Sequence, residues 1–245
     1  MRILLVFLIS AVAFGQNLKT DWQKENLKGK VKSVESIAYR YVGNEGKKEA
    51  LSNFNTQEKY NDKGFKISGR RFTNEGKTSA SWRYFYDDKN HLTKVEILNE
   101  KNQVEEVLKY IYEAKVQKEE VLGYDASGKL TGKQVASYDE KGNKINELSL
   151  TADGAFLLRQ EIVYDAKNNV SEKRFEDKEG KKVLLKYVYD DKNNIIEENY
   201  YGEGNQLYGQ KIFSYKYDSK GNWTQRTERI YDVERVVTER KIEYF

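Results

Sequence analysis

The sequence predicts an all-β fold: a repetitive antiparallel meander of about fifteen strands, built from hairpin units of ~26 residues. Three observations lead to this prediction: a regularly spaced Tyr motif, two turn residues in each repeat, and alternating apolar and polar residues between the turns. About fifteen neighbouring strands would span roughly 70 Å in a flat sheet. Because sheets of that width twist and curl, we expect a twisted or curled open sheet.

The Tyr motif sets the period of the chain. It begins at Tyr60, Tyr86, Tyr112, Tyr138, Tyr164, Tyr189 and Tyr217, in steps of 26, 26, 26, 26, 25 and 28 residues. A nearly constant spacing of this length is typical of a repeated supersecondary unit.

Each unit contains two positions that predict tight turns. The fourth residue after the Tyr is Gly or Asn in six of the seven copies, and the sixteenth is Gly or Asn in the first six. Both residue types adopt positive φ at low cost. The residue directly after the Tyr is Asp, Asn or Glu, and Asp and Asn side chains can bond the backbone two residues on. The turns leave about eight residues for each strand.

The residues before each Tyr alternate between apolar and polar. Ala80, Trp82, Tyr84 and Tyr86 share one parity, and Val183, Leu185, Tyr187 and Tyr189 repeat the pattern. Period two predicts strands with one apolar face and one wet face. The strand after each Tyr turn mixes Thr, Glu and Lys with its apolar residues, so we expect it to be less buried. A Gly or Asn every dozen residues argues against helices.

The N-terminal 15 residues predict a secretory signal peptide. Arg2 precedes a twelve-residue apolar stretch, and Ala13 and Gly15 supply the small residues that a signal peptidase requires. Cleavage near Gly15 would release a secreted, periplasmic or cell-surface protein. No later segment is apolar enough to cross a bilayer, so we expect no transmembrane segment in the mature chain.

Two further segments follow in the predicted domain organisation. Residues 16–59 form a polar leader and an irregular capping unit, in which Asp21 and Trp22 begin the fold and residues 31–41 form a strand. Residues 60–245 form the repeat domain of seven units. Its third unit has Val116 at a turn position, which predicts a distorted turn, and its sixth has two extra residues near Tyr208, which predict a bulge or wider loop.

The composition excludes several classes of protein. The formal net charge is only +4, with 43 Lys and Arg against 39 Asp and Glu interspersed along the chain, so we expect no nucleic-acid partner. There is no Cys for a disulfide or a lipid anchor. An outer-membrane barrel is disfavoured, because the parity that ends at Phe245 would place Glu243, Lys241 and Glu239 toward lipid.

The hexads resemble the YD repeats of RHS-type proteins. The residues that carry the resemblance are Tyr138-Asp139 with Gly142-Asn143 and Tyr217-Asp218 with Gly221-Asn222. The resemblance implies a secreted or surface array of β-hairpins; large members of the family enclose a toxin, and some repeats are linked to carbohydrate binding. The chain departs from the family where Asn or Phe follows the turn Gly instead of Arg. Its Glu-Gly-Lys half-turns, such as residues 75–77, also resemble MORN-type repeats.

No catalytic site, metal site or cofactor is predicted. His91, the single His, stands where other copies hold a turn Asn. Asp190 and Asp191 precede Lys192, which would repel a calcium ion. The aromatic residues are the candidate ligand-binding set, because a ladder of rings could stack on sugars or grip a partner, although the same ladder could form the core. The candidates are Trp82, Tyr84, Tyr86, Tyr110, Tyr112, Tyr187, Tyr189, Tyr215, Tyr217 and Trp223.

Three functional hypotheses remain. The leading one is an exported, non-catalytic repeat protein that binds a protein or carbohydrate partner at the cell envelope, because turn and strand geometry explains nearly every recurrent residue. The second is an envelope carbohydrate hydrolase that uses paired carboxylates. The third is a structural or immunity-like protein associated with a toxin.

Overall fold

The computed structural model describes residues 19–42, 47–51, 54–113, 117–231 and 233–245. The predicted signal peptide and the predicted irregular turn at Val116 lie outside these residues. Within them, no helix is both long enough and apolar enough to cross a membrane.

The described chain is almost entirely β-structure, as predicted, with one short α-helix and one 3-10 turn. The elements are α1 (Asp21–Lys24), β1 (Val31–Val42), β2 (Lys47–Ala50), β3 (Asn55–Tyr60), β4 (Lys66–Phe72), β5 (Thr78–Tyr86), β6 (Leu92–Asn99), β7 (Val104–Glu113), β8 (Lys118–Asp125), β9 (Leu130–Tyr138), β10 (Lys144–Thr151), β11 (Phe156–Tyr164), β12 (Val170–Asp177), β13 (Lys182–Tyr189), β14 (Ile195–Tyr201), η2 (Glu203–Asn205), β15 (Leu207–Tyr217), β16 (Trp223–Ile230) and β17 (Val233–Tyr244).

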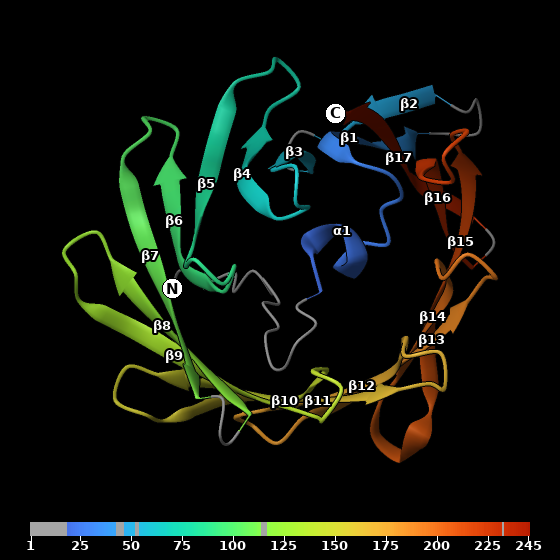
Figure 1. Ribbon diagram of the computed structural model, residues 1–245. Helices are drawn as coiled ribbons and strands as arrows, with labels where there is room; N and C mark the ends of the chain where they lie inside the picture. The colour runs from blue at the N-terminus through green and yellow to red at the C-terminus, as the bar shows by residue number, and fades with distance from the viewer. Residues whose placement is uncertain (1–18, 43–46, 52–53, 114–116, 232) are drawn as a thin grey trace.

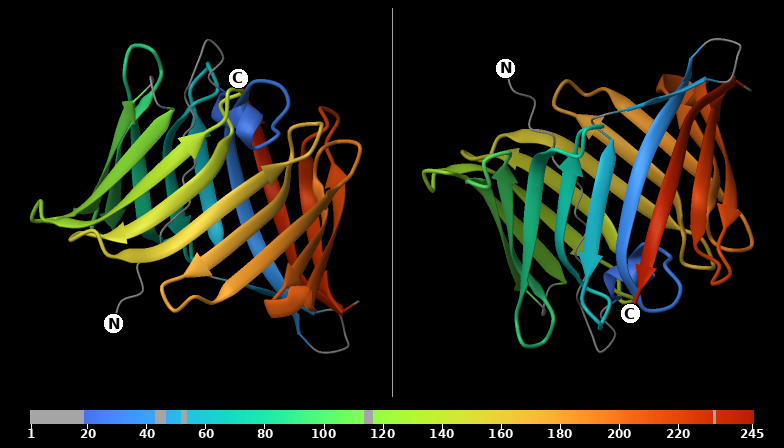
Figure 2. Two further views of the ribbon diagram at one scale, coloured as in Figure 1. Left: turned by 90° about the horizontal axis from the view of Figure 1, so that it is seen from below. Right: turned by 90° about the horizontal axis from the view of Figure 1, so that it is seen from above.

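The sheet is closed, which corrects the prediction of an open sheet. Consecutive strands from β3 to β17 pair as an antiparallel meander, and β17 then pairs with β1 from Val31↔Tyr244 to Arg40↔Val236. The other edge of β1 pairs with β2 and then with β3, so these two strands act as one interrupted strand. The 17 strands therefore form a 16-strand barrel, seen from one end in Figure 1 and from the sides in Figure 2.

The predicted corners are confirmed. Every described Gly or Asn at the two turn positions has positive φ, including Gly142 at 76° and Gly154 at 91°. The Asp at the corner holds the turn: Asp139 Oδ1 accepts the backbone N–H groups of Lys141 and Asn143 at 2.9 and 2.8 Å. His91 is a turn residue of this kind, with its backbone N–H bonded to Asp87. The extra residues of the sixth unit form η2, next to a β-bulge at Tyr201.

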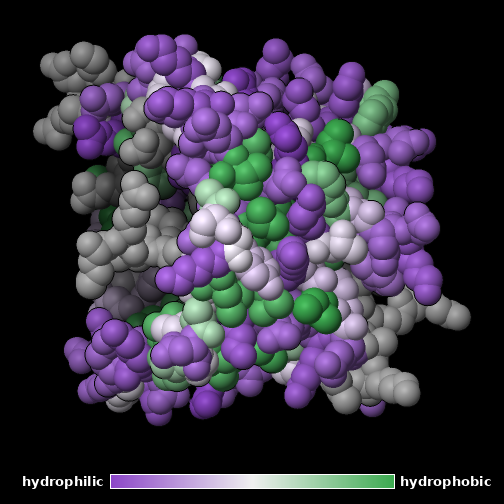
Figure 3. Space-filling view, turned by 90° about the vertical axis from the view of Figure 1, so that its left-hand side faces the viewer, coloured by the Kyte–Doolittle hydropathy of each residue, from purple (hydrophilic) through white to green (hydrophobic). Residues whose placement is uncertain are grey.

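The tyrosine parity faces the inside of the barrel. Tyr84 and Tyr110 are buried, whereas Phe85 and Ile111, the next residue in each strand, are exposed. Outward-facing apolar residues are interspersed with charged ones, and Figure 3 shows this mixture on one side of the wall. The inward aromatic stripe and outward mixed stripe follow from the period-two pattern of the sequence.

The strands that follow the Tyr turns are not less buried, so that prediction was wrong. In β6, Leu92, Val95 and Leu98 are buried, and in β8 even the Glu119 side chain is 1% exposed. Many of the charged residues that blur the alternation of these strands point into the barrel. The polar residues were misread as solvent-facing because an open sheet has no polar interior.

Candidate functional site

The inner surface of the barrel differs between its two halves. Along β5 to β8, Tyr84, Leu92, Val95, Tyr110 and Val121 form a packed apolar cluster. Along β10 to β17, a cavity of about 830 Å³ opens between the wall and α1. The cavity is the candidate site, because it is concave, aromatic and polar at once, and its size suits a small ligand.

The two halves divide the predicted ligand-binding aromatics. Trp82, Tyr84, Tyr86, Tyr110 and Tyr112 belong to the apolar cluster or pack against it. Tyr189, Tyr215 and Trp223 line the cavity.

The two remaining candidates lie next to the cavity. The Tyr187 ring lies 6.0 Å from the Lys173 ammonium, which belongs to the cavity wall. Tyr217 lies at a corner, where its hydroxyl donates to Asp190 at 2.9 Å. The predicted ladder is therefore core on one side of the barrel and cavity wall on the other.

The cavity tyrosines form a fixed wall. The hydroxyls of Tyr164, Tyr189 and Tyr215 each donate to a backbone carbonyl on a neighbouring strand, at 2.9, 2.8 and 2.6 Å. Burial raises the pKa of each of these phenols to about 12, so all three stay neutral at physiological pH. With their polar ends bonded, they present ring surface to the cavity.

Two arginines share one indole ring in the cavity. The Arg240 guanidinium lies 3.5 Å from the centre of the Trp223 ring, and that of Arg226 lies 5.5 Å from it. Arg226 also lies 5.4 Å from the centre of the Phe213 ring. Cation–π contacts of this kind fix the planes of the guanidinium groups. Sequence reasoning found Trp223 but missed both arginines.

A lysine and a glutamine add further hydrogen-bond donors. Lys173 and Gln160 come from the adjacent strands β12 and β11 and line the same cavity. Burial lowers the pKa of Lys173, an effect that the Glu198 charge opposes. Gln160 is 3% exposed, and its side-chain nitrogen makes no hydrogen bond. Both interrupt the apolar alternation of their strands, a signal that could have identified them.

The helix α1 lies within one mouth of the barrel (Figure 1). On one side, Asp21 accepts the backbone N–H of Lys66 at 2.8 Å, and Glu25 forms an ion pair with the Lys66 side chain. On the other side, Asn26 donates to the carbonyl of Lys192, in the corner before β14, at 2.8 Å. Thr20 and Gln23 form a capping box that starts the helix. This Thr-x-x-Gln pattern was visible in the sequence and could have predicted the helix.

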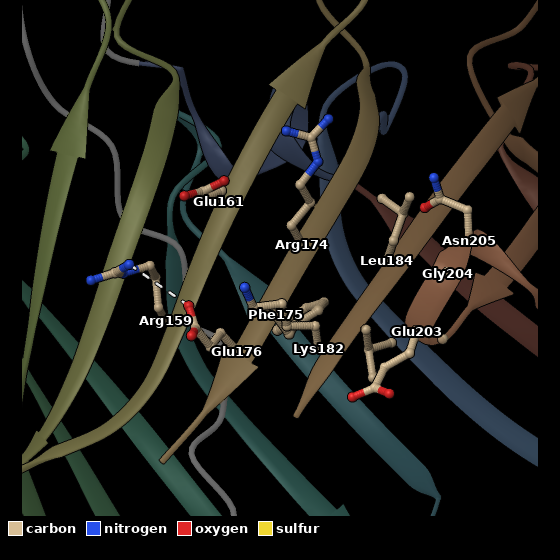
Figure 4. A pocket seen from close by; sticks show the side chains of 12 residues that line it. Arg159, Glu161, Arg174, Phe175, Glu176, Lys182, Leu184, Glu203, Gly204 and Asn205 are labelled. Atoms are coloured by element: carbon tan, nitrogen blue, oxygen red, sulfur yellow. Dashed lines mark ion pairs between the residues drawn. The ribbon is translucent and has the colours of Figure 1, made fainter. Parts of the chain in front are cut away.

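A second depression of about 450 Å³ lies between β11, β12, β13 and η2 (Figure 4). Its charged residues largely neutralise one another: Arg159 pairs with Glu176 at 3.7 Å, and Arg174 pairs with Glu172 at 2.7 Å. The two arginine side chains are about half exposed, so these ion pairs contribute little stability and do not indicate a ligand site. The inner cavity is the stronger candidate.

Two buried carboxylates lie in the barrel wall. Lys144 Nζ lies 2.5 Å from Glu147 and 3.8 Å from Glu119, and Glu119 also accepts the Tyr138 hydroxyl at 2.9 Å. Burial raises the pKa of Glu119, against the opposing effect of Lys144. The pair was not predicted, because its members come from β8 and β10. Lys144 offsets the charge of one carboxylate, and burial favours the protonated form of Glu119, so this network has a structural role and little net charge.

The comparison with solved structures supports the fold. No family model matches the chain, and no curated protein matches it in sequence. A porin-like protein from Bacteroides uniformis is similar in structure, with a TM-score of 0.59 and 12% identity over 87% of this chain and 98% of that one. A porin-like protein from Bacteroides vulgatus has a TM-score of 0.47 and 13% identity, over 88% of this chain and 98% of that one.

The resemblance to RHS-type YD repeats was wrong. The structural neighbour of similar fold is a porin-like protein, and the sheet of this chain closes into a barrel. The error has a physical cause: Tyr-Asp-x-x-Gly-Asn encodes a hairpin corner with one left-handed residue. Any antiparallel meander needs such corners, so the motif does not distinguish a barrel from another hairpin array.

Proposed function

We propose that this chain is an exported, non-catalytic β-barrel that binds a small ligand inside its lumen at the bacterial cell envelope. The observation that supports this proposal is the cavity between β10 and β17. It is bordered by α1 toward one mouth and lined by aromatic rings, amides and cations. Export rests on the predicted signal peptide, and the envelope setting also fits the porin-like neighbour of similar fold.

Binding in the lumen replaces binding on a flat sheet. The aromatic face is turned inward and no longer offers a broad surface to a protein. A ligand of the size of a short oligosaccharide fits the cavity, and its rings would meet Tyr164, Tyr189 and Tyr215. The recurrent Asp residues hold corners through backbone N–H groups, which supports a non-catalytic role.

A conducting pore is the second candidate, favoured by the porin-like neighbour. Two features argue for the ligand-binding role. First, α1 lies in one mouth, and residues 21–26 are bonded to the wall at Lys66 and at Lys192. Second, the outer wall carries charges on several strands, for example Arg83 on β5, Arg159 on β11 and Lys186 on β13. A lipid-facing Lys or Arg costs about 2–4 kcal/mol near the bilayer midplane.

The test is a pair of matched tryptophan substitutions in β11. Ile162 lines the cavity, whereas Val163 is exposed on the outer wall. A panel of neutral and acidic oligosaccharides is screened by thermal shift, and hits are measured by calorimetry. We expect Ile162→Trp to weaken binding at least roughly 10-fold and Val163→Trp to leave it unchanged, because only the first fills the cavity.

Two outcomes would contradict the proposal. One is a hit whose affinity is the same in wild type and Ile162→Trp, which would place the ligand outside the lumen. The other is single-channel conductance of the purified protein in planar bilayers, which would favour the pore.

A further inference from the structure

The charge of the cavity is unbalanced. Seven Lys or Arg residues but only two Glu residues line it. Two of the cations are already neutralised, because Lys144 pairs with Glu147 and Lys24 pairs with Asp21. Of the two acids, Glu25 is held by Lys66. Glu198 is therefore the lining carboxylate that is not already in an ion pair. The remaining cations face the cavity together with it.

Three of the remaining cations lie beside aromatic rings. In the described part of the chain, Lys173, Arg226 and Arg240 form no ion pair within 4.0 Å. Arg226 and Arg240 share the Trp223 ring and repel each other. Burial lowers the pKa of Arg240 to about 10; the Glu25 carboxylate opposes this shift, and the Arg226 charge adds to it. Two like charges in one partly desolvated space favour an anion between them.

Two buried donors in the wall of this cavity are unpaired. The Gln160 side-chain nitrogen and the Arg240 Nε are both buried and make no hydrogen bond. Buried donors without partners are costly, so natural proteins rarely keep them without a reason. Both residues line the cavity, from β11 and β17. A ligand with acceptor oxygens would satisfy both.

The arginine geometry suits planar or tetrahedral oxyanions. The Trp223 ring lies against the Arg240 guanidinium, and the Phe213 ring lies near that of Arg226. Arginine edges bind carboxylate and phosphate in a bidentate manner. Neutral sugars would leave these charges uncompensated, while the tyrosine rings suit the remainder of a ring-bearing ligand.

From these contacts we infer that the lumen selects an anionic small molecule, held through its carboxylate or phosphate by Arg226, Arg240 and Lys173, with Gln160 donating to a ligand oxygen. This inference rests on the proposed lumen-binding function and names the chemical class of its ligand. Carboxylate and phosphate share the recognition chemistry, and the probes below separate an acidic saccharide from a phosphorylated compound.

Calorimetry with three probes tests the inference. The probes are trigalacturonic acid, inorganic phosphate and maltotriose, the last being an uncharged trisaccharide of similar size. We expect one of the two anions to bind, and its affinity to fall at high salt. If the acidic saccharide is preferred, maltotriose should bind at least roughly 10-fold more weakly than trigalacturonic acid.

Charge-removing variants supply the second part of the test. We expect Arg226→Gln and Lys173→Gln each to weaken anion binding roughly 10- to 100-fold. The control is Arg159→Gln, on the outer wall and paired with Glu176, which should leave binding unchanged. Circular dichroism confirms that each variant retains the β fold before it is titrated.

Failure of this inference differs from failure of the lumen-binding function. The anion inference is overturned when neither anion binds at millimolar concentration, when maltotriose binds as tightly as trigalacturonic acid, or when both Gln variants keep wild-type affinity. In those cases a neutral ligand that loses affinity in Ile162→Trp would leave lumen binding standing. If no ligand responds to Ile162→Trp, the lumen-binding function itself fails.

Discussion

At the scale of single residues, side-chain chemistry decides the corners. A left-handed residue is needed wherever a strand reverses, and Gly and Asn supply it at lowest cost. The sequence therefore predicted Gly64, Asn90 and Asn168 as corner residues, and each has positive φ. The same logic assigned His91 correctly, because its place in the repeat marked it as a turn residue.

Several residues that interrupt the alternation line the candidate site. Arg240 shares its parity with Ile242 and Tyr244, which pack inside the barrel, and so it points inward too. Lys173, cross-strand partner of Leu185, does the same. Their inward direction could be predicted from parity. Their meeting in one cavity could not, because they come from strands far apart in sequence.

Glu58 gives a residue-scale prediction for pH dependence. Burial raises its pKa from 4.5 to about 7, partly offset by Lys66. A raised carboxyl pKa means that the folded state holds its proton more tightly than the unfolded state. Stability from this group is therefore complete below about pH 4.5 and declines as pH rises toward 7, by up to about 3 kcal/mol.

Urea unfolding between these pH values tests the Glu58 prediction. Glu58→Gln should remove most of this decline, whereas Glu161→Gln, at an exposed outer position, should keep the wild-type profile. Parallel profiles for wild type and Glu58→Gln would show that Glu58 does not carry the effect.

At the scale of elements, α1 is a short helix that makes many contacts with the barrel wall. Its four residues are too few to be stable alone. Contacts hold it: the Trp22 indole donates to the Val31 carbonyl at 2.9 Å, the Tyr60 hydroxyl donates to Glu25 at 2.6 Å, and the Tyr86 hydroxyl donates to Asp21 at 3.3 Å. The barrel wall thus determines this helix.

Two alanine substitutions measure the docking of α1. Gly64 and Gly76 have φ of +89° and +80°, so alanine strains both by about 1–2 kcal/mol. An added Cβ at Gly64 would also meet the Trp22 ring at 2.6 Å, whereas one at Gly76 would meet nothing within 4 Å. We expect Gly64→Ala to destabilise the fold by a further ~1–3 kcal/mol.

Hydrogen exchange supplies the local measurement. In Gly64→Ala, the backbone amides of residues 22–27 should exchange faster than in Gly76→Ala, because the added Cβ disrupts the contact between Trp22 and residue 64. Equal unfolding free energies and equal exchange in the two variants would mean that Trp22 does not dock on Gly64 in solution.

At the scale of the whole molecule, closure is the decisive event. Each corner in the sequence predicts that the two strands it joins pair with each other, and a meander of such pairs has two free edges. Pairing of β1 with β17 removes both edges, and with them the risk of edge-to-edge aggregation. Closure also turns one face of the sheet into an interior, and creates the cavity.

A disulfide across the seam tests closure. The chain has no Cys, so introduced cysteines are the only ones present. Ile37 pairs with Glu239 across β1 and β17, and paired Cα atoms lie within disulfide reach. Ile37→Cys with Glu239→Cys should form an internal disulfide on mild oxidation, visible as faster migration in a denaturing gel.

The matched control moves one cysteine by one strand. Gln225 pairs with Glu239 on the far side of β17, which puts it roughly twice a strand spacing from Ile37. Ile37→Cys with Gln225→Cys should stay reduced. If neither pair oxidises internally, or both do equally, the seam is not closed as described.

The sequence by itself determined the strand class, the corners and the face on which the tyrosines lie, because these depend on local backbone preference and on period-two alternation. Residues such as Gly142 and Tyr84 carry that information in their own neighbourhood. Only the tertiary structure decided that the meander closes, that α1 lies within one mouth, and that Arg226, Arg240 and Lys173 face one cavity. Those features depend on which strands far apart in sequence lie together, whereas a turn motif predicts only the pairing of the two strands that it connects.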